Sequence, residues 1–269
     1  MFYIQTERGV KIAVYDLNPA GRKCLFLVHG WPLDHRMYEY QLNVLPKYDI
    51  RCVSIDLRGF GASSAPWGEY SYDEFAYDIY RVIRAMGLRD IYLCGFSMGG
   101  AIVIRYMARF REYRIKKLIL VGAAAPSFIQ REGYSYGITK EQLDQIISNL
   151  NADRPQAVVD FGKNFFYNPV SEPFRTWFNS INFDASGIGT IKSAESLGKE
   201  DLSNDLKEIT VPCGIFHGRH DQVCPYEFAL ELEKGIKNSK LYTFEQSGHG
   251  VFYDEREKFN ETLINFINE

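Results

Sequence analysis

One pentapeptide of the sequence has the spacing of a serine nucleophile. Gly95-Phe96-Ser97-Met98-Gly99 matches the G-x-S-x-G pattern, with an apolar run before it and an amphipathic segment after it. These flanks predict a strand, a very tight turn and a helix, in which the serine adopts a strained backbone and the small residues on either side allow close approach. The helix start then offers N–H groups and partial positive charge where an oxyanion forms. The pattern therefore predicts Ser97 as the nucleophile of an acyl transfer.

A serine hydroxyl is a weak nucleophile and needs a base within hydrogen-bond reach. Of the five histidines, His249 lies in a Gly-flanked segment directly after the apolar run 241–244. An α/β sheet presents its functional loops at this place, beyond the carboxyl ends of the strands. We therefore predict His249 as the general base. The other four have structural explanations: His29 builds a loop, His35 is solvated, His217 is satisfied and partly buried, and His220 is too close to Asp221 to be oriented by it.

The acid that orients the base is expected between serine and histidine in chain order, at another strand end. Asp221 meets this condition, because it follows the apolar run 213–217 in a polar loop. Some hydrolases place the acid one strand earlier, but residues 120–126 contain no carboxylate. The order Ser97, Asp221, His249 is itself informative, since unrelated triads use other orders. Asp221 is therefore the predicted acid.

Two backbone N–H groups are expected to hold the oxyanion. One belongs to Met98, which follows the nucleophile, and the other to the loop 29–34, which follows a buried apolar run. Pro32 has no N–H, so Trp31 is the predicted second donor. The residues predicted to contact the substrate adjoin this loop, the acid and the base; they are Trp31, Pro32, Val223 and Val251.

The apolar runs that must position these residues predict a doubly wound α/β fold. Runs at 2–6 and 10–15, joined through a turn that ends at Gly9, predict an antiparallel hairpin. After them, short continuous apolar runs alternate with amphipathic segments such as 71–85, in which Ser71 and Glu74 form a candidate capping box. This alternation predicts right-handed crossovers and a mostly parallel sheet. The expected parallel strands lie at 24–28, 52–55, 91–94, 118–121 and 213–216.

The stretch 126–209 interrupts the alternation. It holds helical segments such as 141–150 and several prolines, but no good buried strand. A structureless loop of this length is improbable in a compact domain. We therefore expect a helical cap at 126–209, inserted into a core formed by residues 1–125 and 210–269. The cap carries a dense aromatic set, of which a minority is expected to line a pocket: Phe161, Phe165, Phe166, Tyr167, Trp177, Phe178 and Phe183.

The bulk composition argues against several classes of partner. The formal net charge is −3 and no basic patch stands out, which disfavours nucleic acid and anionic membranes. No apolar stretch approaches the roughly 20 residues that span a bilayer, and the first residues lack the features of a secretory signal. The five cysteines are dispersed without a C-x-x-C pair, against a disulfide framework or a zinc site. A cytoplasmic protein without a metal site is expected.

Five motifs together resemble the α/β-hydrolase superfamily, and within it the cofactor-free haloperoxidase and aryl-esterase branch. They are HGWPLD at 29–34, DLRGFGAS at 56–63, GFSMGG at 95–100, GRHD at 218–221 and SGHG at 247–250. The resemblance implies an α/β-hydrolase fold with a helical cap, and a carboxylic-ester hydrolase (EC 3.1.1) that acts on small esters and needs no cofactor. Trp31-Pro32 matches members in which perhydrolysis is most often reported. There, hydrogen peroxide replaces water at the acyl-enzyme.

Other functions share the same triad. C–C bond hydrolases, thioesterases and proline aminopeptidases use it, although an aminopeptidase would need a carboxylate cluster that the cap does not show. A ligand receptor with a slow triad, or a pseudo-enzyme, belongs to a different class, and measured turnover discriminates them from an esterase. The fold alone decides none of these. The sequence leaves the acyl group open, and also the oligomeric state, a homo-oligomer included.

Overall fold

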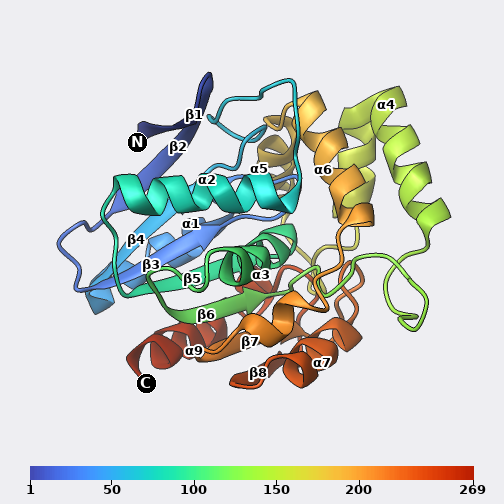
Figure 1. Ribbon diagram of the computed structural model, residues 1–269. Helices are drawn as coiled ribbons and strands as arrows, with labels where there is room; N and C mark the ends of the chain where they lie inside the picture. Colours follow the sequence, from blue (N-terminus) through green and yellow to red (C-terminus); the bar gives the residue numbers. More distant parts are fainter.

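An eight-stranded sheet with the order β1-β2-β4-β3-β5-β6-β7-β8 runs through the molecule (Figure 1). The computed structural model describes residues 1–269. Strand β2 is antiparallel to both β1 and β4, and all other neighbouring strands are parallel. The predicted mostly parallel sheet with an N-terminal hairpin is confirmed. The strands are β1 Phe2–Glu7, β2 Val10–Leu17, β3 Lys23–Val28, β4 Ile50–Ile55, β5 Ile91–Phe96, β6 Ile115–Val121, β7 Cys213–Gly218 and β8 Ser239–Phe244.

Helices cover both faces of this sheet, which explains why its central strands are continuous apolar runs. Side chains of β3 alternate between two core layers, with Phe26 and Val28 in one and Leu25 and Leu27 in the other. The first layer packs against α2 Tyr72–Ala85, α3 Met98–Arg109 and α7 Tyr226–Gly235. The second packs against the short η1 His35–Tyr38, α1 Glu39–Leu42, η2 Leu45–Tyr48 and α8 Val251–Asp254, and against α9 Arg256–Asn268.

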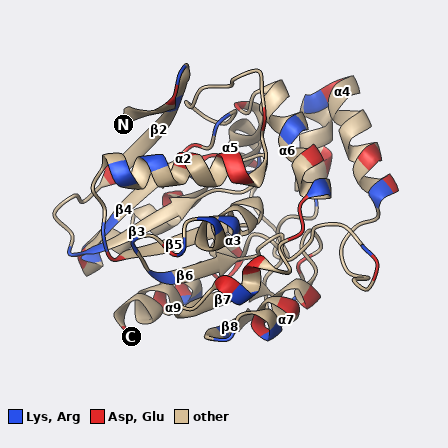
Figure 2. Cartoon of the chain, viewed as in Figure 1, with Lys and Arg blue, Asp and Glu red and all other residues tan.

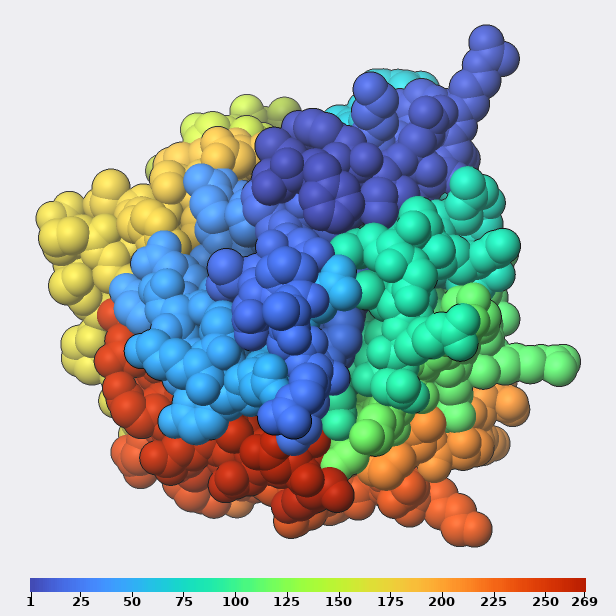
Figure 3. Space-filling view, turned by 90° about the vertical axis from the view of Figure 1, so that its left-hand side faces the viewer, coloured from blue at the N-terminus to red at the C-terminus, as the bar shows by residue number.

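The parts of the chain before and after residues 126–209 pack against one another. In Figure 3 the red C-terminal residues lie directly below light-blue and mid-blue segments from the N-terminal part of the chain. The contact is apolar, since Leu45 before the insertion and Leu263 after it belong to the same buried cluster. All five cysteines are buried and unpaired.

Residues 126–209 add no strand to the sheet. The helices α4 Lys140–Gly162, α5 Glu172–Phe183 and α6 Gly187–Lys199 gather at one end of it, drawn from yellow-green to orange in Figure 1, and the short η3 Asp205–Glu208 leads back. Helix α4 begins with a capping box, in which the Thr139 hydroxyl accepts from the Gln142 N–H and the Gln142 side chain returns to Thr139. Its two halves meet at the non-helical Asp153, just before Pro155. The predicted helix 141–150 is thus only the first half of a longer, kinked one.

No helix of the structure combines the length and the apolar character needed to cross a bilayer. Charged residues of both signs are interspersed over the elements visible in Figure 2.

The start of α2 corrects one detail of the sequence analysis. The Ser71 hydroxyl caps the helix by accepting from the Glu74 N–H at 3.3 Å. The reciprocal half of the predicted capping box is absent. The Glu74 carboxylate instead lies 3.3 Å from the Arg58 guanidinium, because a cation held in the neighbouring loop is a stronger partner than a neutral N–H.

Arg58 forms a buried ion pair that ties this loop to α2. Its Nε and one terminal nitrogen donate to the two Asp78 carboxylate oxygens at 2.6 and 2.8 Å, and the two side chains are 3% and 0% exposed. We expect Asp78→Ala to lower the free energy of unfolding by about 3 kcal/mol, since a buried guanidinium would lose its bidentate partner. Urea unfolding followed by circular dichroism measures this. Asp144→Ala, which breaks an exposed pair with Lys140, is the control and should change stability by less than about 1 kcal/mol; equal losses would contradict the prediction.

Candidate active site

Ser97 occupies a strained turn between β5 and α3. Its φ of 53° and ψ of −120° lie in a region that residues with a side chain rarely adopt. The turn is also crowded, because a Cβ placed on Gly95 would lie 2.4 Å from the carbonyl oxygen of Gly99. The strand, the tight turn and the helix expected from the G-x-S-x-G pattern are therefore all present around Ser97.

The loop after β3 passes directly against this turn. A Cβ on Gly30 would lie 2.8 Å from the Cβ of Ser97, so only glycine fits there. The next backbone N–H, that of Trp31, donates to no acceptor in the protein, and neither does that of Met98. Met98 is the first residue of α3, where N–H groups have no partner within the helix. Two unpaired donors thus belong to the segments that meet at Ser97.

His249 and Asp221 form a buried hydrogen-bonded pair. His249 Nδ1 lies 2.8 Å from Asp221 Oδ2, and both side chains are fully buried. Asp221 Oδ1 accepts from the backbone N–H groups of Val223 and Cys224, each at 2.8 Å. Burial by itself raises the pKa of Asp221, but the charge of His249 and hydrogen bonds from His217 and His249 outweigh it and hold this pKa well below its usual range. The ionised carboxylate therefore fixes the His249 tautomer with the proton on Nδ1.

The second ring nitrogen of His249 is buried without a hydrogen-bond partner. The ring is held between Phe96, the residue before Ser97, and Phe165, with centroid distances of 4.7 and 4.9 Å. No hydrogen bond joins the Ser97 hydroxyl to His249 Nε2. An unpaired buried acceptor costs free energy, and hydrogen bonds of catalytic groups often tighten only when substrate binds. Nε2 is thus an unoccupied proton acceptor beside the Ser97 turn.

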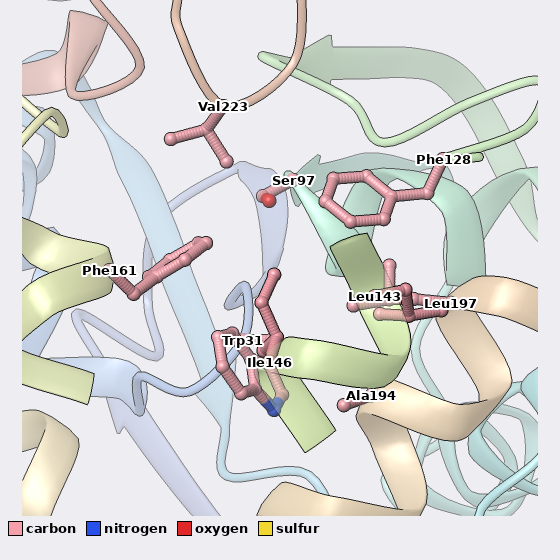
Figure 4. Close-up of a pocket in the computed structure, with 9 residues that line it drawn as sticks. All are labelled: Trp31, Ser97, Phe128, Leu143, Ile146, Phe161, Ala194, Leu197 and Val223. Carbon is pink, nitrogen blue, oxygen red and sulfur yellow. The ribbon is translucent and has the colours of Figure 1, made fainter. Parts of the chain in front are cut away.

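A narrow apolar pocket opens at Ser97 (Figure 4). Its wall combines Trp31 of the loop after β3, Val223 of the loop after β7, Phe128 and residues of the helices α4 and α6, and none of these residues is charged. The lining residues are Trp31, Ser97, Phe128, Leu143, Ile146, Phe161, Ala194, Leu197 and Val223. The cavity therefore suits an uncharged group bound next to the serine hydroxyl.

The structure separates the four residues that the sequence suggested as substrate contacts. Trp31 and Val223 line the cavity, whereas Pro32 and Val251 do not. Pro32 is buried in its loop, and Val251, at the start of α8, is fully buried in the core layer that packs against α9. Of the aromatic residues in the cap that the sequence analysis singled out, only Phe161 reaches the cavity. The remainder includes Phe165, which packs against His249 instead.

Trp31 also joins the loop after β3 to the helices α4 and α6. Its indole Nε1 donates to the carbonyl oxygen of Thr190 in α6 at 2.9 Å. The ring of Phe161 in α4 packs edge-on against it, with centroids 4.9 Å apart. The position of α4 and α6 is therefore coupled to the loop that carries the Trp31 N–H.

One cluster elsewhere has residue types that bind metals. Donor atoms of Asp34, His35 and Asp56 lie within 4.8 Å of one another. However, the Asp34 oxygens accept from the Arg36 guanidinium, and the Asp56 oxygens accept from His35 and from the Tyr15 hydroxyl. This network holds loops together and places a fixed positive charge where a cation would bind. It also corrects the prediction for His35, which is not simply solvated, because η1 folds it against the buried Asp56 at 2.8 Å.

Comparisons with known proteins give one consistent result. The family model described as the alpha/beta hydrolase fold matches residues 23–256. The AB hydrolase superfamily protein YisY of Bacillus subtilis is 49% identical over 99% of this chain and 98% of its own length. An esterase (EaEST) from Exiguobacterium antarcticum has a TM-score of 0.97 at 45% identity, covering 99% of both chains. A bromoperoxidase from Bacillus anthracis has a TM-score of 0.92 at 32% identity, covering 97% of this chain and 96% of its own. The resemblance drawn from the five motifs is confirmed.

Proposed function

This chain belongs to the α/β-hydrolase family, and from that premise we propose that it is a serine carboxylesterase (EC 3.1.1) with Ser97 as nucleophile, His249 as general base and Asp221 as the orienting acid. One observation carries the proposal: a buried, ionised Asp221 fixes the His249 tautomer and leaves Nε2 unpartnered at the strained Ser97 turn. The similarity of the chain to an esterase and to a bromoperoxidase supports this activity. We also propose that residues 126–209 form a cap on the core of residues 1–125 and 210–269.

The reaction proceeds through an acyl-enzyme. His249 Nε2 takes the proton of Ser97 as the oxygen attacks the ester carbonyl, and the N–H groups of Trp31 and Met98 donate to the resulting oxyanion. When the intermediate collapses, the C–O bond to the alcohol breaks and the alcohol takes the proton from Nε2. A water molecule then gives a proton to Nε2 and attacks the acyl carbon, and the second collapse releases the acid and restores Ser97. Apart from the ester and the water, every step uses only groups of this chain.

The substrate is a small, uncharged ester. A narrow pocket with no charged lining residue favours a short apolar group and offers no partner for a charged one. Hydrogen peroxide can replace water as the acceptor of the acyl group without any other change in the mechanism. A perhydrolase side activity, in which the released peracid oxidises halide, is therefore part of the proposal.

The proposed function is tested with p-nitrophenyl esters of graded acyl length, with and without hydrogen peroxide. We expect turnover of p-nitrophenyl acetate by the purified protein, and peracid formation once peroxide is added. A receptor with a slow triad would instead show a thermal shift with a bound ligand and negligible turnover over the whole panel, which would overturn the esterase assignment.

Leu143 should limit the length of the acyl group. It projects from α4 into the cavity (Figure 4), and Leu143→Ala removes three carbon atoms from the wall. Because each newly buried methylene contributes about 0.8 kcal/mol, we expect the kcat/KM ratio of hexanoate to acetate esters to rise about tenfold. Leu230→Ala is the control, since Leu230 is 46% exposed and lies outside the cavity. An unchanged ratio for Leu143→Ala would place the acyl group elsewhere.

A further inference from the structure

His217 contacts the carboxylate of Asp221, which the sequence analysis did not anticipate. It lies near the end of β7 and is fully buried, rather than partly buried as predicted. Its Nε2 lies 2.8 Å from the carbonyl oxygen of Cys224 and 3.4 Å from Asp221 Oδ2. Its Nδ1 is buried without a partner, so the ring is not fully satisfied either. Since both neighbours of Nε2 are oxygens, Nε2 carries the ring proton, which it donates to the Cys224 carbonyl oxygen while facing Asp221 Oδ2, and Nδ1 presents a lone pair.

This contact closes the turn that carries the acid. Within the turn, Asp221 Oδ1 accepts from the N–H of Cys224, while the carbonyl oxygen of the same Cys224 accepts from His217. His217 thereby fixes the far end of the turn and contributes its ring dipole to Oδ2, the oxygen that binds His249. A carboxylate on a short loop would otherwise rotate, and each such restraint improves its alignment with the base.

Few other groups act on this pair. The titratable groups of β7 and of the loop after it that face Asp221 are His217 and the Cys224 thiol, with the Tyr226 ring edge-on to His217 at 6.0 Å. Burial raises the pKa of the Cys224 thiol well above its usual range, so it is uncharged at neutral pH. From β5 and the cap, only uncharged aromatic rings pack against the His249 ring. Besides His249, His217 is therefore the one side chain whose ring N–H lies within ionic-contact distance of the Asp221 carboxylate.

We propose that His217 is a positioning residue of the triad, an inference that rests on the proposed serine-esterase function. Its Nε2–H holds the Asp221 turn closed and stabilises the ionised carboxylate, so that Oδ2 stays aligned with His249 Nδ1. The His217 N–H also weakens the attraction of Asp221 Oδ2 for the proton on His249 Nδ1, because a carboxylate charge that is shared with a second donor attracts that proton less.

The test compares two substitutions of His217. His217→Met keeps a similar volume without a donor, and we expect kcat for p-nitrophenyl acetate to fall about tenfold with KM changed less than about twofold. We also expect the acidic limb of the kcat/KM profile to move to higher pH by about half a unit, because Oδ2 then holds the protonated base more strongly. In His217→Gln the amide can place an N–H near the position of Nε2. This variant should therefore keep most of the kcat and most of the original position of the acidic limb. Ile215→Val, on the same strand and fully buried, is the packing control and should leave the limb in place.

Each outcome separates positioning from packing. If His217→Met and His217→Gln lose stability and rate equally while the acidic limb stays in place, His217 is only a core residue and the proposal is overturned. The low-field NMR resonance of the His249 Nδ1 proton gives a readout without turnover, and we expect it to shift in His217→Met but not in His217→Gln. Absence of turnover in the unmodified protein would instead count against the esterase function, and the NMR comparison would still decide whether His217 acts on the Asp221–His249 pair.

Discussion

Ser97→Ala should reduce kcat for p-nitrophenyl acetate by roughly a millionfold, leaving only the residual rate from substrate binding and the oxyanion donors. Without the hydroxyl no acyl-enzyme forms, and His249 has no nucleophile to activate. Stability should change little, because alanine carries the same Cβ through the positive-φ turn and loses only a hydroxyl. The measurements are steady-state kinetics and the mass of the protein after treatment with a fluorophosphonate. The adduct should appear in the unmodified protein and not in Ser97→Ala.

Ser54→Ala is the matched control for this substitution. Ser54 lies in β4, is 1% exposed, and its hydroxyl has no hydrogen-bond partner. Its removal should leave turnover and labelling as they are in the unmodified protein. If Ser97→Ala keeps more than about a thousandth of the activity, the nucleophile lies elsewhere.

Asp221→Asn should lower kcat by roughly ten-thousandfold with KM almost unchanged. The amide oxygen can still accept from the N–H groups of Val223 and Cys224, as Asp221 Oδ1 does now. The amide nitrogen then takes the place of Oδ2 and points a donor at His249 Nδ1. That arrangement favours the opposite tautomer, with the proton on Nε2, which cannot accept the proton of Ser97. The loss therefore arises from a misplaced proton and not from a displaced side chain.

The tautomer explanation distinguishes this loss from general damage. Asp16→Asn, at an ion pair with Arg51 on the N-terminal strands, should leave kcat within about twofold of its normal value. The folded fraction of Asp221→Asn should match that of the unmodified protein in thermal unfolding followed by circular dichroism. A loss of less than about tenfold would show that Asp221 does not orient the base.

The sheet and the Ser97 turn could be predicted because their signals are local. Strands covered on both faces are short apolar runs, so β3 to β7 were recognisable one by one. The turn at Ser97 depends on neighbours two residues away, where any side chain on Gly95 would strike Gly99. His217 carried a local signal too, since it precedes Asp221 by four residues at a strand end. Its apolar neighbours, however, predict an ordinary, satisfied core residue.

The cavity and the polar networks could not be predicted in the same way, because distant segments meet there. The wall at Ser97 combines Leu143 of α4, Ala194 of α6 and Trp31 of the loop after β3, which are far apart in the chain. The positions of Pro32 and Val251 beside the expected site did not bring them to its wall, since the direction of a side chain depends on how its element packs. The same holds for His35: its polar neighbours predict a solvated side chain, whereas η1 places it against Asp56.

The sequence by itself therefore determined the alternation of strands and helices, the serine turn and the chemical types of its partners. These follow from backbone sterics and apolar periodicity, which act over a few residues. Only the tertiary structure decided which nitrogen of His249 is free, what holds Asp221, and which side chains bound the cavity. Those properties arise from close packing and hydrogen bonding between segments that meet only when the sheet, the helices of residues 126–209 and the loops come together.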